Sequence, residues 1–335
     1  MEHKYKNIFI NLSLVIAAII ATLFAIEILC SIGSYFFYPR LIIRDDALGW
    51  KYIPTKKKIT RNFSKDIAYD LYINSQGFRD DEFRKNKSCF KIMVLGDSMT
   101  FGMEVNQEDI FCNVLERKLK STHPGRNIDV MNFGITGFST AQELLCLKKY
   151  GDVYNPNIVI LMLFEPNDFS DNPLVISSGR YHPHFIIESG KLKLYNKPSL
   201  LQHTVTFFRD KSFLVYFMSN RIKSGSTMLT QKVILNEQDN ILLMKGILTE
   251  MHNYTKQKNI PFFIFYITNK ATGNSKYVSI EKFCEERAIP LKEILLLKTE
   301  RFYSGHWNKE GNNSVAEIIF RELSGYKVLD MLTDR

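Results

Sequence analysis

The sequence is poor in residues that hold metal ions or cross-link small domains. Five cysteines and seven histidines occur in 335 residues, and no spacing between them is typical of a zinc site. The net charge of +9 is spread along the chain and no nucleic-acid motif accompanies it. These absences argue against a zinc module, a metal-dependent phosphodiesterase and a nucleic-acid-binding protein. We expect each cysteine to serve in packing.

Charge is also scarce near the N-terminus. Ile8 to Ile32 is apolar almost throughout, with Glu27 as the only charge, and is about long enough to cross a bilayer. No small-x-small cleavage site follows this run, which favours a retained anchor over a signal peptide. We therefore predict a cytoplasmic tip and one transmembrane helix over residues 1–37. Glu27 is expected near the interface or in a contact with another helix.

The flanking charges do not orient this span. Lys4 and Lys6 precede it, whereas Arg40, Arg44 and Lys51 follow it. Long domains can be translocated largely regardless of their charge, so a simple count does not decide the side.

What the rest of the chain does contain is an alternation of apolar runs with helical patterns. At 45% hydrophobic residues, the chain can bury a large core. Such alternation predicts an α/β domain with a parallel sheet covered by helices on both faces. The expected strands span 91–95, 128–133, 158–163 and 261–267, and the expected helices include 110–119, 141–149 and 309–323.

One apolar run ends on a serine in a glycine-flanked turn. Ile92 to Leu95 is followed by Gly96-Asp97-Ser98. A strand that ends in this way projects a hydroxyl from the sheet edge, where a nucleophile must stand. The competing interpretation is that Ser98 only caps the next helix.

Three downstream segments favour the nucleophile. Asn132-Phe133-Gly134-Ile135-Thr136-Gly137 follows a second strand, Pro166-Asn167-Asp168 a third, and Gly305-His306-Trp307-Asn308 precedes the last helix. Ser, Gly, Asn and His thus occur in that order, each at the end of a strand or the start of a helix.

This pattern resembles the SGNH (GDSL-type) hydrolase family over about Tyr72 to Leu323. The preamble Ile73-Asn74-Ser75-Gln76-Gly77-Phe78-Arg79 is similar to the one in membrane-anchored bacterial members. The resemblance implies a flavodoxin-like three-layer α/β/α fold. It also implies an enzyme that acts on ester bonds without a metal or cofactor.

The resemblance implies a role for each motif residue. Ser98 is the expected nucleophile and His306 its general base. The N–H groups of Ser98 and Gly134 and the side-chain amide of Asn167 are the expected oxyanion hole. Asp97 is expected to shape the turn.

The sequence departs from the family in one respect. Members with this histidine block usually carry an aspartate two or three residues before the histidine, where this chain has Ser304 and Tyr303. Three hypotheses remain. Ser304 or a main-chain carbonyl orients His306 in a Ser–His dyad, a carboxylate such as Glu300 reaches the ring, or the protein has lost hydrolysis and kept binding. We rank the dyad first, because the other motif residues all survive.

Composition suggests the domain limits. We expect a stem and preamble over 38–88, with Lys56-Lys57-Lys58 either against anionic head groups or merely solvated, then a hydrolase domain over 89–325 and a tail over 326–335. An insertion over about 172–240 carries a β-hairpin at 185–195 and an aromatic-rich helix from Leu200 to Arg221. The insertion is well placed to form a lid or one wall of a substrate cleft.

Four smaller expectations concern single side chains. His182 and His184 are interpreted as ordinary loop histidines, because they lack acidic or cysteine partners. Trp307 is expected to pack beneath the histidine loop. Asn308 is expected to cap the last helix.

The functional hypothesis follows from the resemblance. It implies a single-pass membrane protein with an extracytoplasmic domain, periplasmic or at the cell surface, that acts on O-acetyl esters of carbohydrate through an acyl-enzyme. An O-acyltransferase on polysaccharide and a carbohydrate-binding or assembly protein without turnover are the alternatives. The sugar, the acyl group and the oligomeric state have no signal in the sequence.

Overall fold

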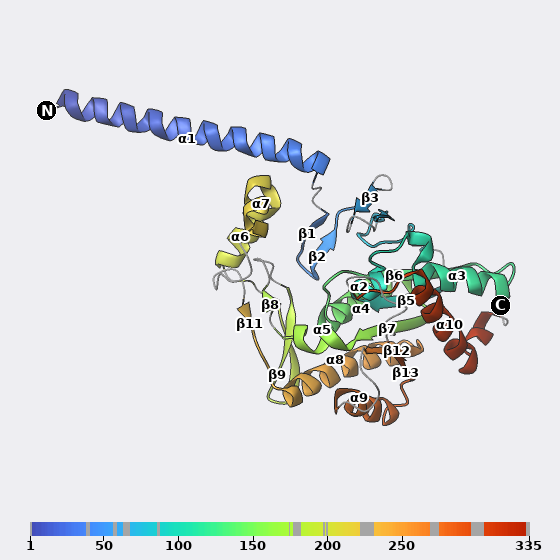
Figure 1. Ribbon diagram of the computed structural model, residues 1–335. Coiled ribbons are helices and arrows are strands. Elements are labelled where there is room, and N and C mark those ends of the chain that lie inside the picture. Colours follow the sequence, from blue (N-terminus) through green and yellow to red (C-terminus); the bar gives the residue numbers. More distant parts are fainter. Residues whose placement is uncertain are drawn as a thin grey trace. The chain divides into compact units, whose positions relative to one another are not determined.

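The computed structural model describes most of the chain (Figure 1). The described residues are 2–37, 41–55, 59–62, 68–85, 88–173, 175–176, 182–196, 198, 200–221, 231–268, 275–295 and 305–332. They form two compact units. The helical unit comprises Met1–Arg44, Ile176–Tyr181 and Pro198–Gln231, and the sheet unit comprises Asp45–Val175, His182–Lys197 and Lys232–Arg335.

A five-stranded parallel sheet forms the centre of the sheet unit. Its strand order is β13-β12-β7-β5-β6, and every neighbouring pair is parallel. Numbered along the chain within this sheet, the order is 2-1-3-4-5, which is the flavodoxin-like arrangement. The strands are β5 (Phe90–Gly96), β6 (Ile128–Gly134), β7 (Ile158–Phe164), β12 (Phe262–Thr268) and β13 (Leu291–Leu295). The predicted fold class is therefore confirmed.

Helices cover both faces of this sheet (Figure 1). On one face, alternate strand residues such as Ile92 and Ile160 share a core with Leu115 and Ile319. Side chains on the other face meet different helices, since Tyr266 packs edge-on against Tyr277. The helices are α2 (Ser98–Phe101), α3 (Phe111–Thr122), α4 (Thr140–Tyr154), α5 (Glu165–Asp171), α8 (Glu237–Gln257), α9 (Ser275–Glu285) and α10 (Lys309–Gly325), with 3-10 turns at Gln107–Asp109 and Val328–Leu332.

The segment predicted to be a stem and preamble belongs to the sheet unit from Asp45 onward. Tyr52 and Tyr69 are buried, and Trp50 donates its indole N–H to the carbonyl of Thr136 at 3.2 Å. Aromatic side chains bury large areas, which a free linker would leave in water. Four short strands lie here: β1 (Ile42–Asp45), β2 (Gly49–Tyr52), β3 (Ile59–Asn62) and β4 (Ala68–Leu71). Lys56-Lys57-Lys58 lies outside the described residues.

The insertion contains the predicted hairpin but not one continuous helix. Strands β9 (His184–Glu188) and β10 (Lys191–Tyr195) pair antiparallel. The expected helix is two helices, α6 (Leu200–Lys211) and α7 (Phe213–Arg221). Ser212 separates them, because its hydroxyl accepts from the backbone N–H of Val215 at 3.1 Å and so begins a new helix. Two short strands, β8 (Val175–Ile176) and β11 (Gln231–Lys232), complete this region.

The N-terminal helix α1 runs over Glu2–Phe37. Within it, Tyr5–Gly33 is long and apolar enough to cross a membrane, and a signal sequence shares that length and composition. The four cysteines outside α1 are all buried and free, as expected: Cys89, Cys112, Cys146 and Cys284.

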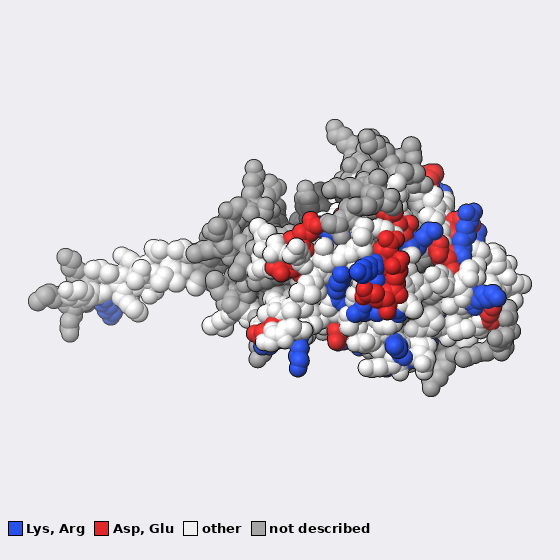
Figure 2. All heavy atoms as spheres, turned by 90° about the horizontal axis from the view of Figure 1, so that it is seen from below, with Lys and Arg blue, Asp and Glu red and all other residues white. Residues whose placement is uncertain are grey.

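Charges of opposite sign are intermixed on the face shown in Figure 2. Within the sheet unit, opposite charges form ion pairs such as Lys148 with Glu250 at 2.8 Å and Lys258 with Asp152 at 2.6 Å. The excess of positive charge therefore does not gather into one patch on this face.

Candidate active site

The candidate site lies at the point of the sheet where the strand order reverses direction. Strand β5 lies between β6 and β7. The chain passes from β5 to β6 on one side, and then from β6 to β7 on the other side of β5. In such sheets, ligands bind beyond the carboxyl ends of the strands at this point. Ser98 follows β5 and Asn167 follows β7, so both lie at this edge.

A tight turn presents Ser98. The carboxylate of Asp97 accepts the backbone N–H of Met99 at 2.8 Å and so caps α2. Only glycine fits at position 96, since a Cβ there would lie 2.0 Å from Oγ1 of Thr100. Gly102 ends the helix after one turn at φ 75°. Asp97 thus shapes the turn, in agreement with its predicted role.

His306 is held from the start of α10. Asn308 caps this helix by accepting from the N–H of Gly311 at 2.8 Å, as predicted. Trp307 is only 3% exposed and packs edge-on against Phe111. Burying Trp307 on one side of the chain turns the preceding imidazole toward the sheet edge.

Ser98, His306 and Glu104 form a continuous chain of contacts. Nε2 of His306 lies 2.9 Å from Oγ of Ser98, and Nδ1 lies 3.1 Å from Oε1 of Glu104. An ionised carboxylate only accepts, so Nδ1 carries the proton and Nε2 is left to accept from the hydroxyl. This arrangement of acid, base and hydroxyl suits proton transfer from a nucleophile.

Glu104 was missed in the sequence: the expected dyad had no carboxylate, whereas Nδ1 of His306 contacts Glu104 in the structure. The family pattern places the acid just before the histidine, whereas Glu104 follows α2, the helix that begins at Ser98. Its backbone is left-handed at φ 72°, which few residues other than glycine adopt. Only the position shortly after the Gly102 turn hinted at this role. Ser304, Tyr303 and Glu300 lie outside the described residues.

Arg79 of the preamble holds the segment that carries Glu104. Its guanidinium donates to the carbonyl of Gly102 and, at 2.6 Å, to the carbonyl of Val105. A third bond, at 2.7 Å, goes to the carbonyl of Asp70. Because two of these acceptors flank Glu104, Arg79 restrains the segment on both sides of the acid.

Arg79 is buried and remains positively charged. The side chain is fully buried, with its guanidinium over the rings of Tyr69 and Phe101. Burial lowers the pKa of Arg79 to about 10, so it remains a cation at neutral pH. Upstream, Oδ1 of Asn74 accepts from the N–H of Phe78 at 2.9 Å and closes the turn that sends Arg79 inward.

Asn167 and Gly134, two of the expected oxyanion-hole donors, differ in whether a hydrogen remains available. Nδ2 of Asn167 donates one hydrogen to Oδ2 of Asp97 at 2.9 Å, and the amide has a second hydrogen. The N–H of Gly134 donates to Oδ1 of Asn132 at 2.9 Å. Gly134 is needed for packing, because a Cβ there would lie 2.4 Å from the backbone nitrogen of Phe101.

Gly137 lies in the turn that follows β6, with a left-handed φ of 76°. Among the described residues, no acceptor binds its N–H. Gly137 belongs to the sequence motif, although Gly134 was the predicted donor.

Three buried carboxyl groups underlie this region: Asp97, Glu143 and Asp168. Burial raises the pKa of Asp97 to about 6, against hydrogen bonds that lower it. Burial, and then the charge of Asp97, raise the pKa of Glu143 well above its ordinary value. The pKa of Asp168 is also raised, first by burial and then by the charge of Glu143.

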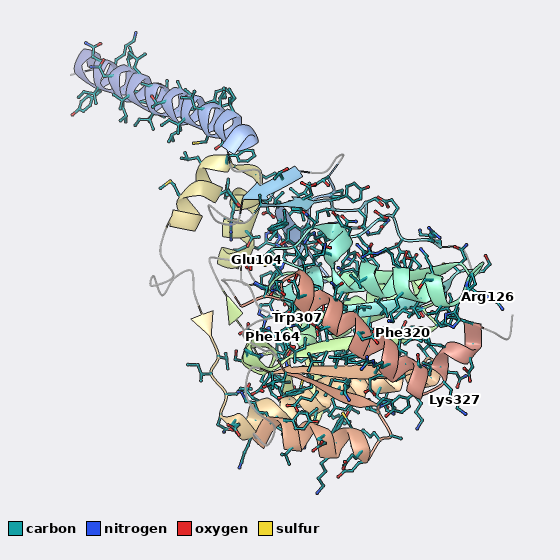
Figure 3. All side chains as sticks on the ribbon, turned by 45° about the vertical axis from the view of Figure 1, so that its right-hand side comes forward. Glu104, Arg126, Phe164, Trp307, Phe320 and Lys327 are labelled. Atoms are coloured by element: carbon teal, nitrogen blue, oxygen red, sulfur yellow. The ribbon has the colours of Figure 1, made fainter. Side chains whose placement is uncertain are left out.

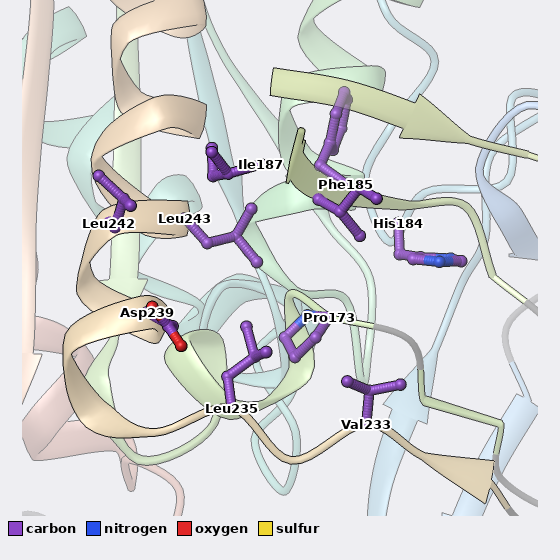
Figure 4. A pocket seen from close by; sticks show the side chains of 10 residues that line it. Pro173, His184, Phe185, Ile187, Val233, Leu235, Asp239, Leu242 and Leu243 are labelled. Carbon is purple, nitrogen blue, oxygen red and sulfur yellow. The ribbon is translucent and has the colours of Figure 1, made fainter. Parts of the chain in front are cut away.

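An apolar cavity of about 320 Å³ lies under the hairpin (Figure 4). It is not lined by Ser98, His306 or Glu104. Its walls come mainly from β9 and the start of α8, and are formed by Pro173, His184, Phe185, Ile186, Ile187, Val233, Leu235, Asp239, Leu242 and Leu243.

His182 and His184 of the insertion are both buried: His182 lies in the loop before β9, as expected, whereas His184 is the first residue of β9. Burial lowers the pKa of both His182 and His184. His182 packs edge-on against Trp50. In the described part of the chain, no group of three His, Cys, Asp or Glu residues is arranged to hold a metal ion.

Figure 3 shows Glu104 and Trp307 at the same end of the sheet unit, although they come from segments far apart in the sequence. The site is therefore assembled from the loop after α2 and the start of α10.

No protein-family model matches this sequence, and no curated protein does. Several solved structures are similar in fold. The psychrotrophic esterase EstA from Pseudoalteromonas sp. is 13% identical, with a TM-score of 0.42 over 70% of this chain and 97% of that one. A lipase/acylhydrolase from Enterococcus faecalis is 15% identical, with a TM-score of 0.39 over 71% and 96%.

A two-domain esterase active on acetylated mannans is 14% identical, with a TM-score of 0.40 over 72% of this chain and 50% of that one. At such identities, function has to be argued from the residues of the site.

Proposed function

We propose that this protein is a membrane-anchored serine esterase that acts through an acyl-enzyme. The observation that carries the proposal is the chain from Ser98 through His306 to Glu104, with contacts of 2.9 and 3.1 Å. A hydroxyl, a base and a carboxylate in this order form the arrangement that recurs in enzymes of acyl transfer.

The reaction follows from the hydrogen bonds. Oγ of Ser98 attacks the ester carbonyl while Nε2 of His306 takes its proton. The proton then passes to the leaving alcohol, and the acyl group stays on Ser98. Water attacks the acyl-enzyme, again losing a proton to His306, and the acid leaves with Ser98 restored. Glu104 stabilises the imidazolium at each step.

Negative charge on the carbonyl oxygen needs donors at the same edge. The N–H of Ser98 and the second hydrogen of the Asn167 amide are two such donors. For the third, Gly137 fits better than Gly134, because the N–H of Gly134 already donates to Asn132. A preorganised donor is worth about 3 to 4 kcal/mol in the transition state.

The proposed substrates are O-acetyl esters of cell-surface carbohydrate. Support comes from the apolar helix α1, which suits an anchor, and from the resemblance of the preamble to membrane-anchored members. In this proposal the sheet unit is extracytoplasmic. A sugar hydroxyl in place of water would make the same residues an O-acyltransferase.

The presence of Glu104 weighs against binding without turnover. That hypothesis was based on the absence of an acid before His306. Glu104 supplies a carboxylate to Nδ1, so His306 has the acidic partner whose absence suggested that hypothesis.

The test is fluorophosphonate labelling of the full-length protein in detergent, with the adduct mapped by mass spectrometry. We expect a label on Ser98 that is lost in Ser98→Ala and strongly slowed in His306→Ala. Ser121→Ala, which changes an exposed serine on α3, is the matched control and should label normally. Labelling that persists in Ser98→Ala, or none in folded wild-type protein, would reject the proposal.

A second measurement separates the two acceptors. Acetate release from an acetylated glycan, without added acceptor, identifies an esterase. Transfer of label to an added, unacetylated glycan identifies an acyltransferase.

A further inference from the structure

The one charge inside the apolar run of α1 is bound by another helix. The carboxylate of Glu27 accepts from the hydroxyl of Ser212 at 2.6 Å and from the N–H groups of Phe213 at 2.6 Å and Leu214 at 3.0 Å. These donors form the start of α7, where unpaired N–H groups and the helix dipole favour an anion. All of these residues belong to the helical unit.

The contact covers one stripe of α1. Glu27, Cys30 and Ser31 are half-buried, whereas Ile28 and Leu29 between them are exposed. Positions i, i+3 and i+4 share one helix face, so α1 presents a defined side at this level. The apolar residues of α1 before Glu27 are exposed within the described structure.

The depth of Glu27 follows from helix geometry. The apolar stretch Tyr5–Gly33 has 29 residues, so it is about 43 Å long at 1.5 Å per residue. If its middle lies at the bilayer centre, Glu27 is about 12 Å from the centre, inside a hydrocarbon half-thickness of about 15 Å. A carboxylate there needs hydrogen-bond donors, and α7 supplies three. The start of α7 must therefore lie at the edge of the hydrocarbon.

The two short helices carry large apolar side chains on their outer surface. Phe207 and Phe208 are about half exposed and pack edge-on against each other. Leu200 is 85% exposed, and Met218 on α7 is also exposed. Lys211 at the end of α6 is exposed, and its long side chain can place its charge at the lipid head groups.

From these observations we propose that α6 and α7 lie in one leaflet of the phospholipid bilayer, at its interface, bound to the anchor through Glu27. The proposal rests on the membrane anchor of the proposed function, but not on catalysis. Exposed aromatic side chains next to an exposed lysine are typical of interfacial helices. The partner is lipid because α7 is bound to the span itself, at the level of the hydrocarbon edge.

The inference also bears on whether α1 is retained. Removal of α1 as a signal peptide would leave the N–H groups of Phe213 and Leu214 without the carboxylate that binds them. Glu27 is thus a positioning residue for α7.

The first test measures the depth of α6 in the full-length protein reconstituted into phosphatidylcholine–phosphatidylglycerol vesicles. Phe208→Trp adds an indole on α6, and Val278→Trp adds one at an equally exposed position on α9 of the sheet unit. The signal of the native Trp50 and Trp307 is subtracted with wild-type protein. We expect the Phe208→Trp indole to emit at shorter wavelength, to be quenched by brominated acyl chains and to be shielded from iodide. The Val278→Trp indole should show the reverse.

Quenching of both indoles by iodide, and of neither by brominated lipid, would overturn the proposal. Shielding of Phe208→Trp from both quenchers would also overturn it, because that result means a protein contact. Ester hydrolysis is not part of this readout, so an inactive protein would not affect it.

The second test uses trypsin on the same vesicles. Glu27→Ala should speed cleavage after Lys211, whereas Glu27→Gln, which keeps one acceptor oxygen, should have a smaller effect. Glu250→Ala, which breaks a surface ion pair with Lys148, is the control. Equal cleavage rates in wild type and Glu27→Ala would contradict the anchoring role. Hydrolysis of a soluble acetate ester should be unchanged in Glu27→Ala.

Discussion

Glu104 contacts Nδ1 of His306 at 3.1 Å, although the two residues are 202 positions apart in the chain. The carboxylate at this nitrogen therefore comes from the segment just after α2, and not from the histidine loop. Acid and nucleophile are joined by a single turn, so one short segment positions both against the imidazole. The left-handed backbone of Glu104 turns its side chain into this position, and Arg79 restrains the residues on either side.

Replacing Glu104 should nearly abolish turnover. In Glu104→Gln the amide can donate to Nδ1, which favours the wrong tautomer of His306. We expect kcat to fall about 1,000- to 10,000-fold, as when the corresponding acid is lost in a serine protease. The measurement is acetate ester hydrolysis together with the rate of fluorophosphonate labelling. Glu300→Gln and Ser304→Ala, which test the earlier hypotheses, should remain close to wild type. A larger loss in either of them than in Glu104→Gln would contradict the assignment.

Arg79→Lys should weaken both stability and turnover. Lysine keeps the positive charge, but its single nitrogen cannot bond to three carbonyls that lie in different directions. We expect the free energy of unfolding to fall by about 3 kcal/mol, since hydrogen bonds to charged groups are involved. With Glu104 less restrained, kcat should fall about 10- to 100-fold with little change in KM.

The control for Arg79 is Arg84→Lys, because Arg84 is a surface arginine that donates to Asn127. Urea unfolding and steady-state kinetics are measured on both variants. The downfield proton resonance of His306 Nδ1–H reports the contact with Glu104 directly. An unchanged resonance and kcat in Arg79→Lys would leave Arg79 with a purely structural role.

Asn167→Ala should lower kcat about 100- to 1,000-fold, the usual effect of losing one oxyanion donor. KM should change much less, because the donor acts mainly on charge that develops in the transition state. Asn113→Ala on α3, where the amide donates to the carbonyl of Gln107, is a control for the loss of an asparagine. A normal kcat in Asn167→Ala would remove this residue from the oxyanion hole.

Glu143→Gln should stabilise the protein increasingly as the pH rises. The pKa of Glu143 is raised in the folded state, so above its ordinary value the folded protein keeps a proton that the unfolded chain releases. Wild-type stability therefore falls with rising pH until the folded pKa is passed, by about 1.4 kcal/mol per pH unit for one proton. Glutamine has no such cost, and neither oxygen of Glu143 bonds to a described residue.

The measurement for Glu143→Gln is urea unfolding of both proteins at pH 5, 7 and 8. The difference in unfolding free energy in favour of the variant should grow across this series. A difference that stays constant with pH would mean that Glu143 is not protonated in the folded protein. Glu250→Gln, at the surface, should show no such trend.

Local pattern alone was enough for much of the fold. Four apolar runs became the buried strands β5, β6, β7 and β12, because strands covered on both faces are apolar at nearly every position. The hairpin over 185–195 and the cap at Asn308 also depend on neighbours in the sequence. Such features were predicted because the interactions that decide them span only a few residues.

Two other features of the fold could not be predicted from neighbouring residues in the sequence. The stem was expected to be a free linker, yet Tyr52 and Tyr69 are buried, because their partners lie elsewhere in the chain. The helix expected over 200–221 breaks at Ser212, where the hydroxyl that begins α7 also binds Glu27. Each of these outcomes depends on a contact between segments that are far apart in the sequence.

The sequence by itself indicated Ser98 and His306 as the candidate nucleophile and base. Ser98 and His306 stand next to strand ends and helix starts, whose composition is local, and the structure brings them to 2.9 Å. Only the tertiary structure placed a candidate acid, Glu104, beside the imidazole. Many carboxylates could serve Nδ1, and the choice of Glu104 depends on how α2, α10 and the buried Arg79 pack together. Packing over such separations carries no periodic signal, so the third member of the site could be found only in three dimensions.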